Sequence, residues 1–176
     1  MKIGLCGTVS VGKTTLVNAL KELPQFKDYT FATERSKYLR DLGIPLNTDS
    51  TMKGQTVFLA ERLSELMNDN LITDRTVIDV MAFTQCSKTI NPIEKEKFRN
   101  YTADFINEYD YIFYISPDGV EIEDNGVRET DAEYRDLIDF TIKHFVNINF
   151  SKMQNYKKIS GTTNERIKQI LEVISL

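Results

Sequence analysis

The sequence of 176 residues contains no tryptophan, one histidine and two cysteines. Cys6 and Cys86 do not form a CxxC pair, and His144 alone cannot complete a metal-binding cluster. These residues exclude a zinc site of the usual Cys and His type. Two cysteines also cannot supply the disulfide framework of a small secreted protein. We therefore interpret both as reduced thiols in the interior of a cytoplasmic protein.

Long hydrophobic runs and an excess of basic residues are also missing. No apolar run approaches the about 18 residues of a membrane span, and the chain starts with a predicted strand, so we expect neither an anchor nor a cleaved signal. The formal net charge of −4 does not indicate a nucleic-acid-binding protein, although it leaves a local basic groove open. The absence of repeats and linkers predicts one domain over residues 1–176.

Short apolar segments alternate with longer amphipathic ones, which is typical of an α/β fold with a parallel sheet. The predicted strands are residues 2–6, 29–32, 76–80, 111–115 and 156–160. Apolar residues at helical spacing predict a helix after each strand, and one helix is expected to run from Pro92 to about Asn107. This pattern predicts five strands with helices between them.

The stretch GLCGTVSVGKTTLVNAL carries the strongest functional signal. It has the spacing of a phosphate-binding loop, with a strand before it and a helix after it. Lys13 is expected to reach the outer phosphates of a nucleotide, and Thr14 to offer its hydroxyl to Mg²⁺. The backbone N–H groups and the helix N-terminus complete an anion site. The predicted nucleotide contacts in this loop are Gly7, Val9, Ser10, Val11, Gly12, Lys13, Thr14 and Thr15.

Acidic residues near the ends of predicted strands are candidates for the metal and the acceptor. Asp79 ends the apolar segment TVID, so it is expected beside the phosphate loop, where it can hold Mg²⁺ or the acceptor; the alternative is a helix cap. Asp74 and Asp110 precede their predicted strands and are interpreted as loop residues. Glu34 follows the second strand and can accept the proton of an attacking hydroxyl; the alternative is an ordinary helix start.

Further candidates are polar residues around this edge of the sheet. Arg35 and Lys37 can contact a polar or anionic acceptor. Gln55 can do the same, but we expect it to be an exposed helix residue.

Residues 117–135 are rich in glycine and charge, and we interpret them as a lid. Arg128 is expected to place a cation over the transferred phosphoryl group, whereas Arg135 is equally consistent with a structural role.

The last strand leads into the segment ISGTTNERIKQI. Gly161 and Thr162 can bring the backbone against an adenine ring, and Arg166 can stack on that ring. A simple turn and helix start explain the same residues equally well.

Five segments together resemble one family: GTVSVGKTT, FATERSKYLRDLG, TVIDVMAFTQ, YDYIFYISPDGVEIEDNGVRETDAEYRD and ISGTTNERIKQI. They are similar, in the same order, to the P-loop kinase domain of bifunctional NAD-biosynthesis regulators, which is a ribosylnicotinamide kinase. The wider AAA-type group includes deoxynucleoside kinases and phage kinases that act on hydroxymethyluracil in DNA. The resemblance implies a three-layer fold with strand order 2-3-1-4-5, a mobile lid, ATP and Mg²⁺.

The resemblance also implies site residues. Gly12, Lys13 and Thr14 match the phosphate and metal site, and Asp79, Glu34 and Arg128 match two acids and a lid arginine. Two departures concern the substrate. The relative has arginine where this chain has Lys37, and the second acid of its Asp-x-Asp pattern is missing here. This chain shows no adenylyltransferase segment, so we expect it not to be bifunctional.

These residues predict a kinase that transfers the γ-phosphoryl group of ATP to a hydroxyl of a nucleoside, ribosylnicotinamide or a nucleotide. Hydroxymethyluracil in phage DNA is an alternative acceptor. A regulatory P-loop NTPase without an acceptor is an alternative function, but the sequence lacks the Asp-x-x-Gly and Asn-Lys-x-Asp motifs of GTPase switches. The chain is expected to act as a monomer or homodimer without a membrane partner.

Overall fold

Five parallel strands form one sheet in the order β2-β3-β1-β4-β5, which confirms the predicted fold class and strand order. The computed structural model describes residues 1–33, 35–118 and 132–174. The strands are β1 (Lys2–Cys6), β2 (Thr30–Ala32), β3 (Leu71–Asp74), β4 (Tyr111–Ile115) and β5 (Tyr156–Ile159). Because all strands run the same way, the segments that follow them meet at one edge of the sheet.

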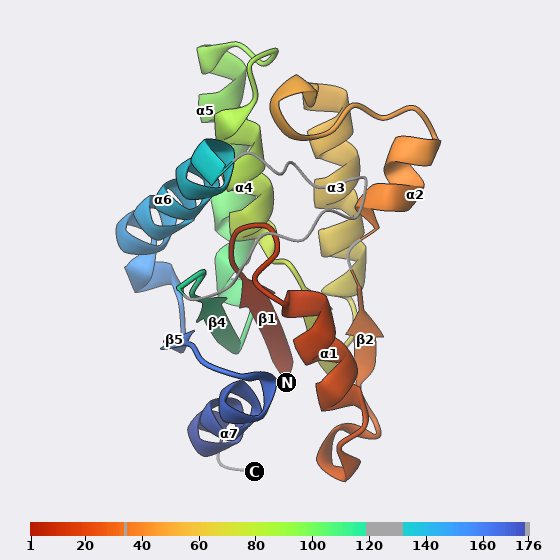
Figure 1. The fold of residues 1–176 in the computed structure, drawn as a ribbon. Coiled ribbons are helices and arrows are strands. Elements are labelled where there is room, and N and C mark those ends of the chain that lie inside the picture. Colours follow the sequence, from red (N-terminus) through yellow and green to blue (C-terminus); the bar gives the residue numbers. More distant parts are fainter. Residues whose placement is uncertain (34, 119–131, 175–176) are drawn as a thin grey trace.

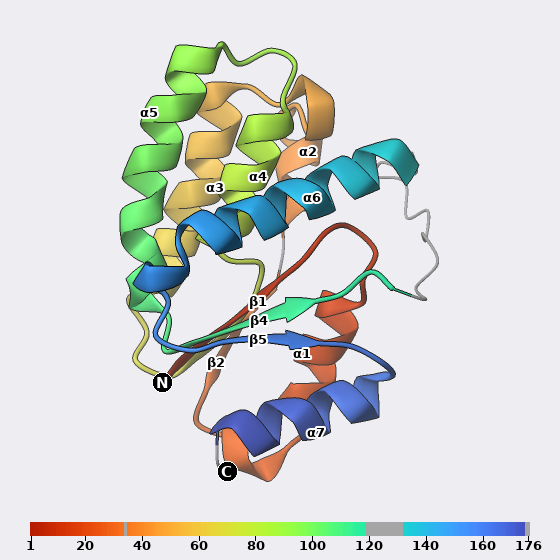
Figure 2. The ribbon, with the colours of Figure 1, turned by 90° about the vertical axis from the view of Figure 1, so that its left-hand side faces the viewer.

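Helices cover both faces of the sheet (Figures 1 and 2). The helices are α1 (Lys13–Lys21), α2 (Ser36–Asp41), α3 (Met52–Glu65), α4 (Val77–Cys86), α5 (Pro92–Thr102), α6 (Ala132–Ile148) and α7 (Thr163–Ile174). Short 3₁₀ helices span Pro24–Phe26, Asn47–Asp49, Ala103–Glu108 and Phe150–Lys152. Helices α1 and α7 lie on one face, and α3, α4, α5 and α6 lie on the other (Figure 2). No helix in the described ranges has both the length and the hydrophobicity of a membrane span.

Each face of the sheet has its own apolar cluster. Leu16 of α1 and Ile170 of α7 belong to the first cluster. Leu59 of α3, Ile78 of α4 and Ile138 of α6 belong to the second. Burial of this apolar surface against the sheet is the main force that holds the layers together.

The prediction of a strand over residues 76–80 is wrong. The third strand is β3, and residues 77–86 form helix α4. Eight of the ten residues of α4 are buried, because it packs against α3, α5 and α6 and shares an apolar cluster with residues of the sheet. A short helix that is buried on nearly all sides has the same continuous apolar pattern as a buried strand.

The helix that starts at Pro92 is also shorter than expected. α5 ends at Thr102, and the chain continues as a 3₁₀ helix to Glu108. Asn91 accepts a hydrogen bond from the backbone N–H of Glu94 and so caps the start of α5. Neither difference changes the strand order.

Candidate functional site

The loop between β1 and α1 has the backbone geometry that a phosphate-binding loop requires. Gly12 caps α1 with φ 81°, and Ser10 also has a positive φ of 58°. A Cβ atom at Gly7 would lie 2.9 Å from the carbonyl oxygen of Ile115 on the neighbouring strand. Glycine is therefore required at the close approach and at the left-handed position. The positive end of α1 faces the space that this loop encloses.

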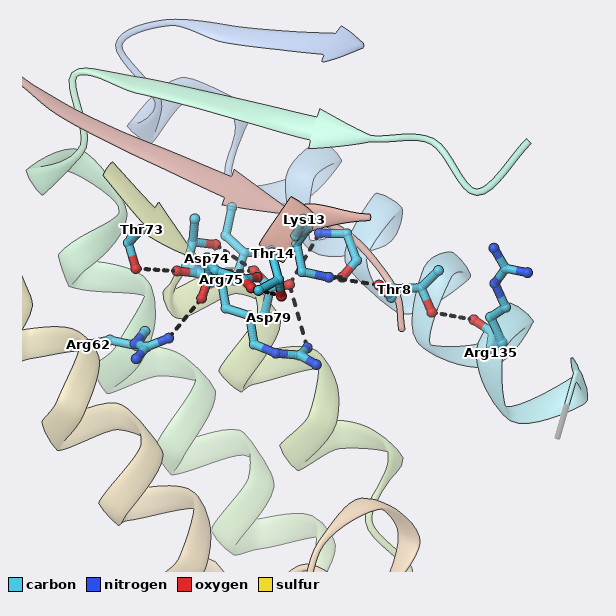
Figure 3. Close-up of polar contacts among 12 residues, drawn as sticks. Thr8, Lys13, Thr14, Arg62, Thr73, Asp74, Arg75, Asp79 and Arg135 are labelled. Atoms are coloured by element: carbon cyan, nitrogen blue, oxygen red, sulfur yellow. Dashed lines mark hydrogen bonds and ion pairs between the residues drawn. The ribbon is translucent and has the colours of Figure 1, made fainter. Parts of the chain in front are cut away.

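Lys13 is buried in this loop, with 5% of its surface exposed. Its Nζ donates hydrogen bonds to the carbonyl oxygens of Gly7 at 2.9 Å and Thr8 at 2.8 Å. Thr8 is itself held by α6, because its hydroxyl donates to the carbonyl oxygen of Arg135 at 2.8 Å (Figure 3). The ammonium group is thus kept inside the loop, at the place where the sequence predicted a phosphate contact.

Thr14 and Asp74 meet across the sheet edge. The Thr14 hydroxyl donates to Asp74 Oδ2 at 2.5 Å, and the other carboxylate oxygen, Oδ1, is buried without a hydrogen-bond partner among the described residues (Figure 3). The interpretation of Asp74 as a residue that precedes its strand is wrong, because Asp74 is the last residue of β3. Asp110 does precede its strand, and accepts a hydrogen bond from the backbone of Lys2.

Asp79 lies in the first turn of α4 and is fully buried. Its Oδ1 accepts the backbone N–H of Gly7 at 3.1 Å. Its Oδ2 accepts from the backbone N–H of Thr76 at 2.8 Å and from the Thr76 hydroxyl at 2.9 Å. Asp79 therefore caps α4 and ties that helix to the phosphate loop. These bonds favour the helix-cap alternative over a metal ligand.

Arg75 was not singled out by the sequence, but it lines the same cleft. The cleft is bounded by Ser10, Val11, Gly12, Lys13, Thr14, Asp74 and Arg75. The Arg75 guanidinium lies over the ring of Phe83 at 4.7 Å and 4.0 Å from Asp79 Oδ1. Its backbone has φ 87°, a left-handed value that is costly for a residue with a side chain.

Two other arginines are bonded to the loop, Arg135 through its backbone carbonyl and Arg166 through its side chain. Arg135 is a residue of α6 and not of a lid loop, and its Nη2 lies 3.5 Å from the carbonyl oxygen of Pro117. Arg166 of α7 is buried, and its Nη1 donates to the carbonyl oxygen of Val11 at 2.6 Å. Burial lowers the pKa of Arg166 from its ordinary value. Since its guanidinium packs on the loop backbone, Arg166 braces the loop, and its stacking on adenine stays a prediction.

The remaining sequence candidates are scattered. Glu34 and Arg128 lie outside the described residues. Gln55 is buried on α3, so the expectation of an exposed helix residue is wrong. Gly161 and Thr162 are exposed at the start of α7, where Thr162 bonds to the Glu165 carboxylate.

The structure also places further candidates for the acceptor side and for the phosphate loop. Arg35 pairs with Glu61 at 3.5 Å and lies over the ring of Tyr38. Val9 and Val11 are buried, and Thr15 is exposed. The structure thus gathers the loop, Asp74 and Arg75 in one cleft and leaves Arg35 at the surface.

The sequence does contain a pattern that could have located Asp74 at the end of its strand. Thr76 and Asp79 form the T-x-x-D pattern of a capping box, which marks a helix start. This pattern places the strand before Thr76 and makes Asp74 the acid at its carboxyl end.

The family model described as an AAA domain matches residues 2–166. The chain belongs to the AAA domain family. No curated protein matches it.

Solved structures share the fold at low sequence identity. Deoxyadenosine kinase from M. mycoides with bound dCTP has a TM-score of 0.69 and 17% identity, with all of both chains covered. The NadR protein in complex with NR has a TM-score of 0.74 and 15% identity, over 99% of this chain and 51% of that one. The YorR protein from Bacillus subtilis, in complex with phosphorylated GDP, has a TM-score of 0.55 and 18% identity, over 100% and 96%. The chain therefore has the P-loop kinase fold.

Proposed function

We propose that this protein is an ATP- and Mg²⁺-dependent kinase that transfers the γ-phosphoryl group to a hydroxyl of a nucleoside-like acceptor. The contact between Thr14 and Asp74 carries the proposal. It joins the hydroxyl that follows the loop lysine to a carboxylate on the neighbouring strand, which is the pair that P-loop enzymes use for Mg²⁺. The fold shared with deoxyadenosine kinase and NadR supports the same reaction class.

The residues of the cleft fit a magnesium ion. Asp74 Oδ1 is a buried carboxylate oxygen without a partner among the described residues, and Thr14 Oγ1 lies next to the same carboxylate. Mg²⁺ takes few protein oxygens and keeps several waters, so a site with fewer than three acidic side chains suits it. The described residues contain no larger metal-binding cluster. A bound Mg²⁺ would neutralise charge on the nucleotide phosphates.

Transfer itself needs cations and a positioned hydroxyl. The acceptor oxygen forms a bond to the γ-phosphorus while the bond to the β–γ bridging oxygen breaks, and ADP leaves. Lys13 and Arg75 both line the cleft and would stabilise the negative charge, and Arg128 is the predicted lid cation. The hydroxyl proton passes to a carboxylate, for which Glu34 is the candidate, because the Asp79 oxygens are already bound to backbone groups. Gly161 and Thr162 remain candidates for the adenine contact.

The fold neighbours and the net charge support the proposed acceptor class. Deoxyadenosine kinase, NadR with NR and YorR with phosphorylated GDP point to nucleosides or nucleotides. The net charge of −4 disfavours a polymeric DNA acceptor, because binding to DNA depends on neutralising its phosphates.

The test is the release of ADP from ATP and Mg²⁺ in the presence of candidate acceptors. The panel contains ribosylnicotinamide, the common nucleosides, nucleoside monophosphates and DNA with hydroxymethyluracil. We expect one small acceptor to raise ADP release far above hydrolysis, with its phosphorylated product detected by mass spectrometry. Lys13→Ala is the matched control, since it removes the loop cation and should abolish transfer.

Three results would overturn the proposal or its acceptor. Slow hydrolysis that no acceptor changes would favour a regulatory NTPase. Full turnover by Lys13→Ala would show that the phosphate loop is not the site of transfer. If phosphorylated product forms only on DNA, the acceptor is a polymer and not a small nucleoside-like molecule.

A further inference from the structure

A buried network of hydrogen bonds lies behind Asp74, on the side away from the phosphate loop. Arg62 of α3 is 3% exposed, and its Nη1 donates to the carbonyl oxygen of Asp74 at 3.0 Å (Figure 3). Its Nη2 pairs with Glu65 Oε1. The hydroxyl of Thr73 donates to Glu65 Oε2 at 2.9 Å and lies 3.1 Å from the carbonyl oxygen of Arg75. The network thus reaches both carbonyl groups of the segment that carries Asp74 and Arg75.

This segment needs external support. Arg75 has a left-handed backbone, which a residue with a side chain keeps only when its surroundings determine it. Asp74 ends β3, and the backbone N–H of Arg75 is bound to the carbonyl oxygen of Leu5 on β1. The side chains of both residues line the nucleotide cleft. A small rotation of this turn would therefore move a carboxylate and a guanidinium together.

We propose that Arg62, Glu65 and Thr73 are positioning residues that hold the Asp74–Arg75 turn in the geometry needed for magnesium nucleotide. The inference rests on the proposed function, since it assigns the network to that metal site. Burial of an ion pair does not by itself add stability, because desolvation offsets the attraction. The pair instead fixes the turn through its contacts: Arg62 binds the Asp74 carbonyl, and Glu65 orients the Thr73 hydroxyl, which lies beside the Arg75 carbonyl.

The test uses Thr73→Val, which keeps the shape of the side chain and removes its hydroxyl. A fluorescent ATP analogue is titrated at a series of Mg²⁺ concentrations, so the readout needs no acceptor. We expect the Mg²⁺ concentration for half-maximal tight binding to rise about tenfold, as for loss of an outer-shell partner, while metal-free nucleotide affinity stays unchanged. Thr84→Val is the matched control, because it removes another buried threonine hydroxyl, bound within α4.

The outcomes separate the two proposals. Equal loss of affinity with and without Mg²⁺ in Thr73→Val, or an effect on thermal stability alone, would overturn the positioning role and leave the kinase proposal standing. Nucleotide binding by the wild type that does not respond to Mg²⁺ would instead overturn the metal site itself. Glu65→Gln keeps an oxygen that can accept from Thr73, so its Mg²⁺ requirement should lie between those of the wild type and Glu65→Ala.

Helix α6 presents a second surface of interest, which rests on observations independent of the nucleotide cleft. This helix buries one face and exposes apolar side chains on the other, at Leu137, Phe140 and Ile148. Phe140 is 70% exposed and lies at the middle of this outer face. Phe150 extends the apolar surface beyond the helix. The Lys152–Asp104 ion pair at 3.0 Å joins this end to the 3₁₀ helix after α5, and Tyr101 near the end of α5 is also exposed.

The charged residues beside Phe140 would complement those of a second copy of the chain. Asp136 lies four residues before Phe140 and Lys143 lies three residues after it, on the same side of the helix. If two copies of α6 pack antiparallel about Phe140, each Asp136 faces Lys143 of the other copy and each Leu137 faces His144. Lys143 is half exposed, although it also pairs with Asp139 of its own chain.

We infer that the outer face of α6 is the contact between two copies of this chain. The arrangement has the self-complementary form that a two-fold interface requires. An interface of ordinary size covers about 800 Å² on each partner, so we infer that the contact extends beyond α6 to the exposed Phe150 and Tyr101.

Sedimentation equilibrium of the full chain tests this contact. We expect a dimer for the wild type, a monomer for Phe140→Glu and a dimer for the control Met67→Glu, whose exposed methionine (85%) lies after α3. Asp136→Lys should weaken the dimer, and the double variant Asp136→Lys with Lys143→Asp should restore it. A monomeric wild type, or a dimer that Phe140→Glu leaves intact, would overturn the inference.

Discussion

Two aspartates near the phosphate loop have different hydrogen-bonding roles. Asp79 uses both oxygens to bind the backbone of Gly7 and the cap residue Thr76. Asp74 binds the Thr14 hydroxyl with one oxygen and keeps the other unpaired among the described residues. A carboxylate with spare acceptor capacity can take a cation, whereas one that is saturated by N–H and O–H donors stabilises the fold.

Asp74→Asn and Asp79→Asn should therefore have different effects. Asp74→Asn is expected to reduce Mg²⁺-dependent turnover by at least about a hundredfold, because it removes the anionic oxygen beside Thr14. Asp79→Asn should instead lower the free energy of unfolding by about 1–3 kcal/mol, since it disturbs the capping box. Steady-state kinetics over a Mg²⁺ series and urea denaturation measure the two effects. If Asp79→Asn instead reduces Mg²⁺-dependent turnover and Asp74→Asn reduces only stability, the metal role belongs to Asp79.

Thr102 is a buried residue whose hydroxyl finds no partner in the described part of the chain. Thr102→Val should raise the free energy of unfolding by about 1 kcal/mol, because it replaces an unsatisfied polar group by a methyl group of similar size. Urea denaturation measures the change. Thr141→Val is the control, since its hydroxyl donates to the carbonyl oxygen of Leu137 at 2.7 Å and its loss should destabilise the protein. Destabilisation by both would show that Thr102 is satisfied in solution.

The phosphate loop depends on α1, which follows it directly, and on two helices that are distant in sequence. α1 supplies Lys13 and Thr14, α6 holds Thr8 through its backbone, and α7 places Arg166 against Val11. The loop is therefore supported on several sides, which keeps its N–H groups directed at an anion before the anion binds.

Arg166→Met should weaken nucleotide binding about tenfold, because a hydrogen bond from a charged group to the loop is lost. Titration with a fluorescent ATP analogue measures the affinity. Lys168→Met is the matched control: it also removes a cation from α7, but its side chain is mostly exposed and it lies away from the loop. Equal effects of the two variants would indicate general electrostatics and not support of the loop.

The whole molecule is built as two apolar clusters on opposite faces of one sheet, with the nucleotide cleft at the edge where the strands end. A ligand that binds there contacts the loop that follows β1, the start of α1 and the end of β3. The strands β1 and β3 contribute side chains to both clusters. Binding should therefore stabilise the fold as a unit.

Magnesium ATP should raise the melting temperature by about 5–10 °C at a hundred times its dissociation constant, since such binding adds about 2.7 kcal/mol to stability. Differential scanning fluorimetry measures the shift. Lys13→Ala should show almost no shift, because its loop has lost the buried cation. A shift that is unchanged in Lys13→Ala would place the nucleotide elsewhere.

The reaction rates of both thiols should report on unfolding of the whole protein. Cys6 and Cys86 are buried, and burial raises the pKa of each thiol above its ordinary value. Thiolate is the reactive form, so both cysteines should react slowly with a thiol reagent even at pH 9 and rapidly once denaturant is added. Fast labelling of the native protein would show that the α4–α6 side opens locally.

Local signals were sufficient where the chemistry is local. The phosphate loop, with Lys13 and Thr14, is encoded within a dozen neighbouring residues, because a strand, a glycine-containing turn and a helix start follow one another directly. The alternation of elements and the family resemblance likewise predicted the parallel sheet and its order.

Contacts between distant segments decided the rest. The apolar pattern of residues 77–82 could not reveal whether they form a strand or a helix, since α4 is surrounded by other helices. Thr14 and Asp74 are 60 residues apart, and Arg62 reaches Asp74 from a third element. Only the packing of β3 beside β1 brings a carboxylate to the loop hydroxyl, because a side chain's partners depend on which strands are neighbours and where each one ends.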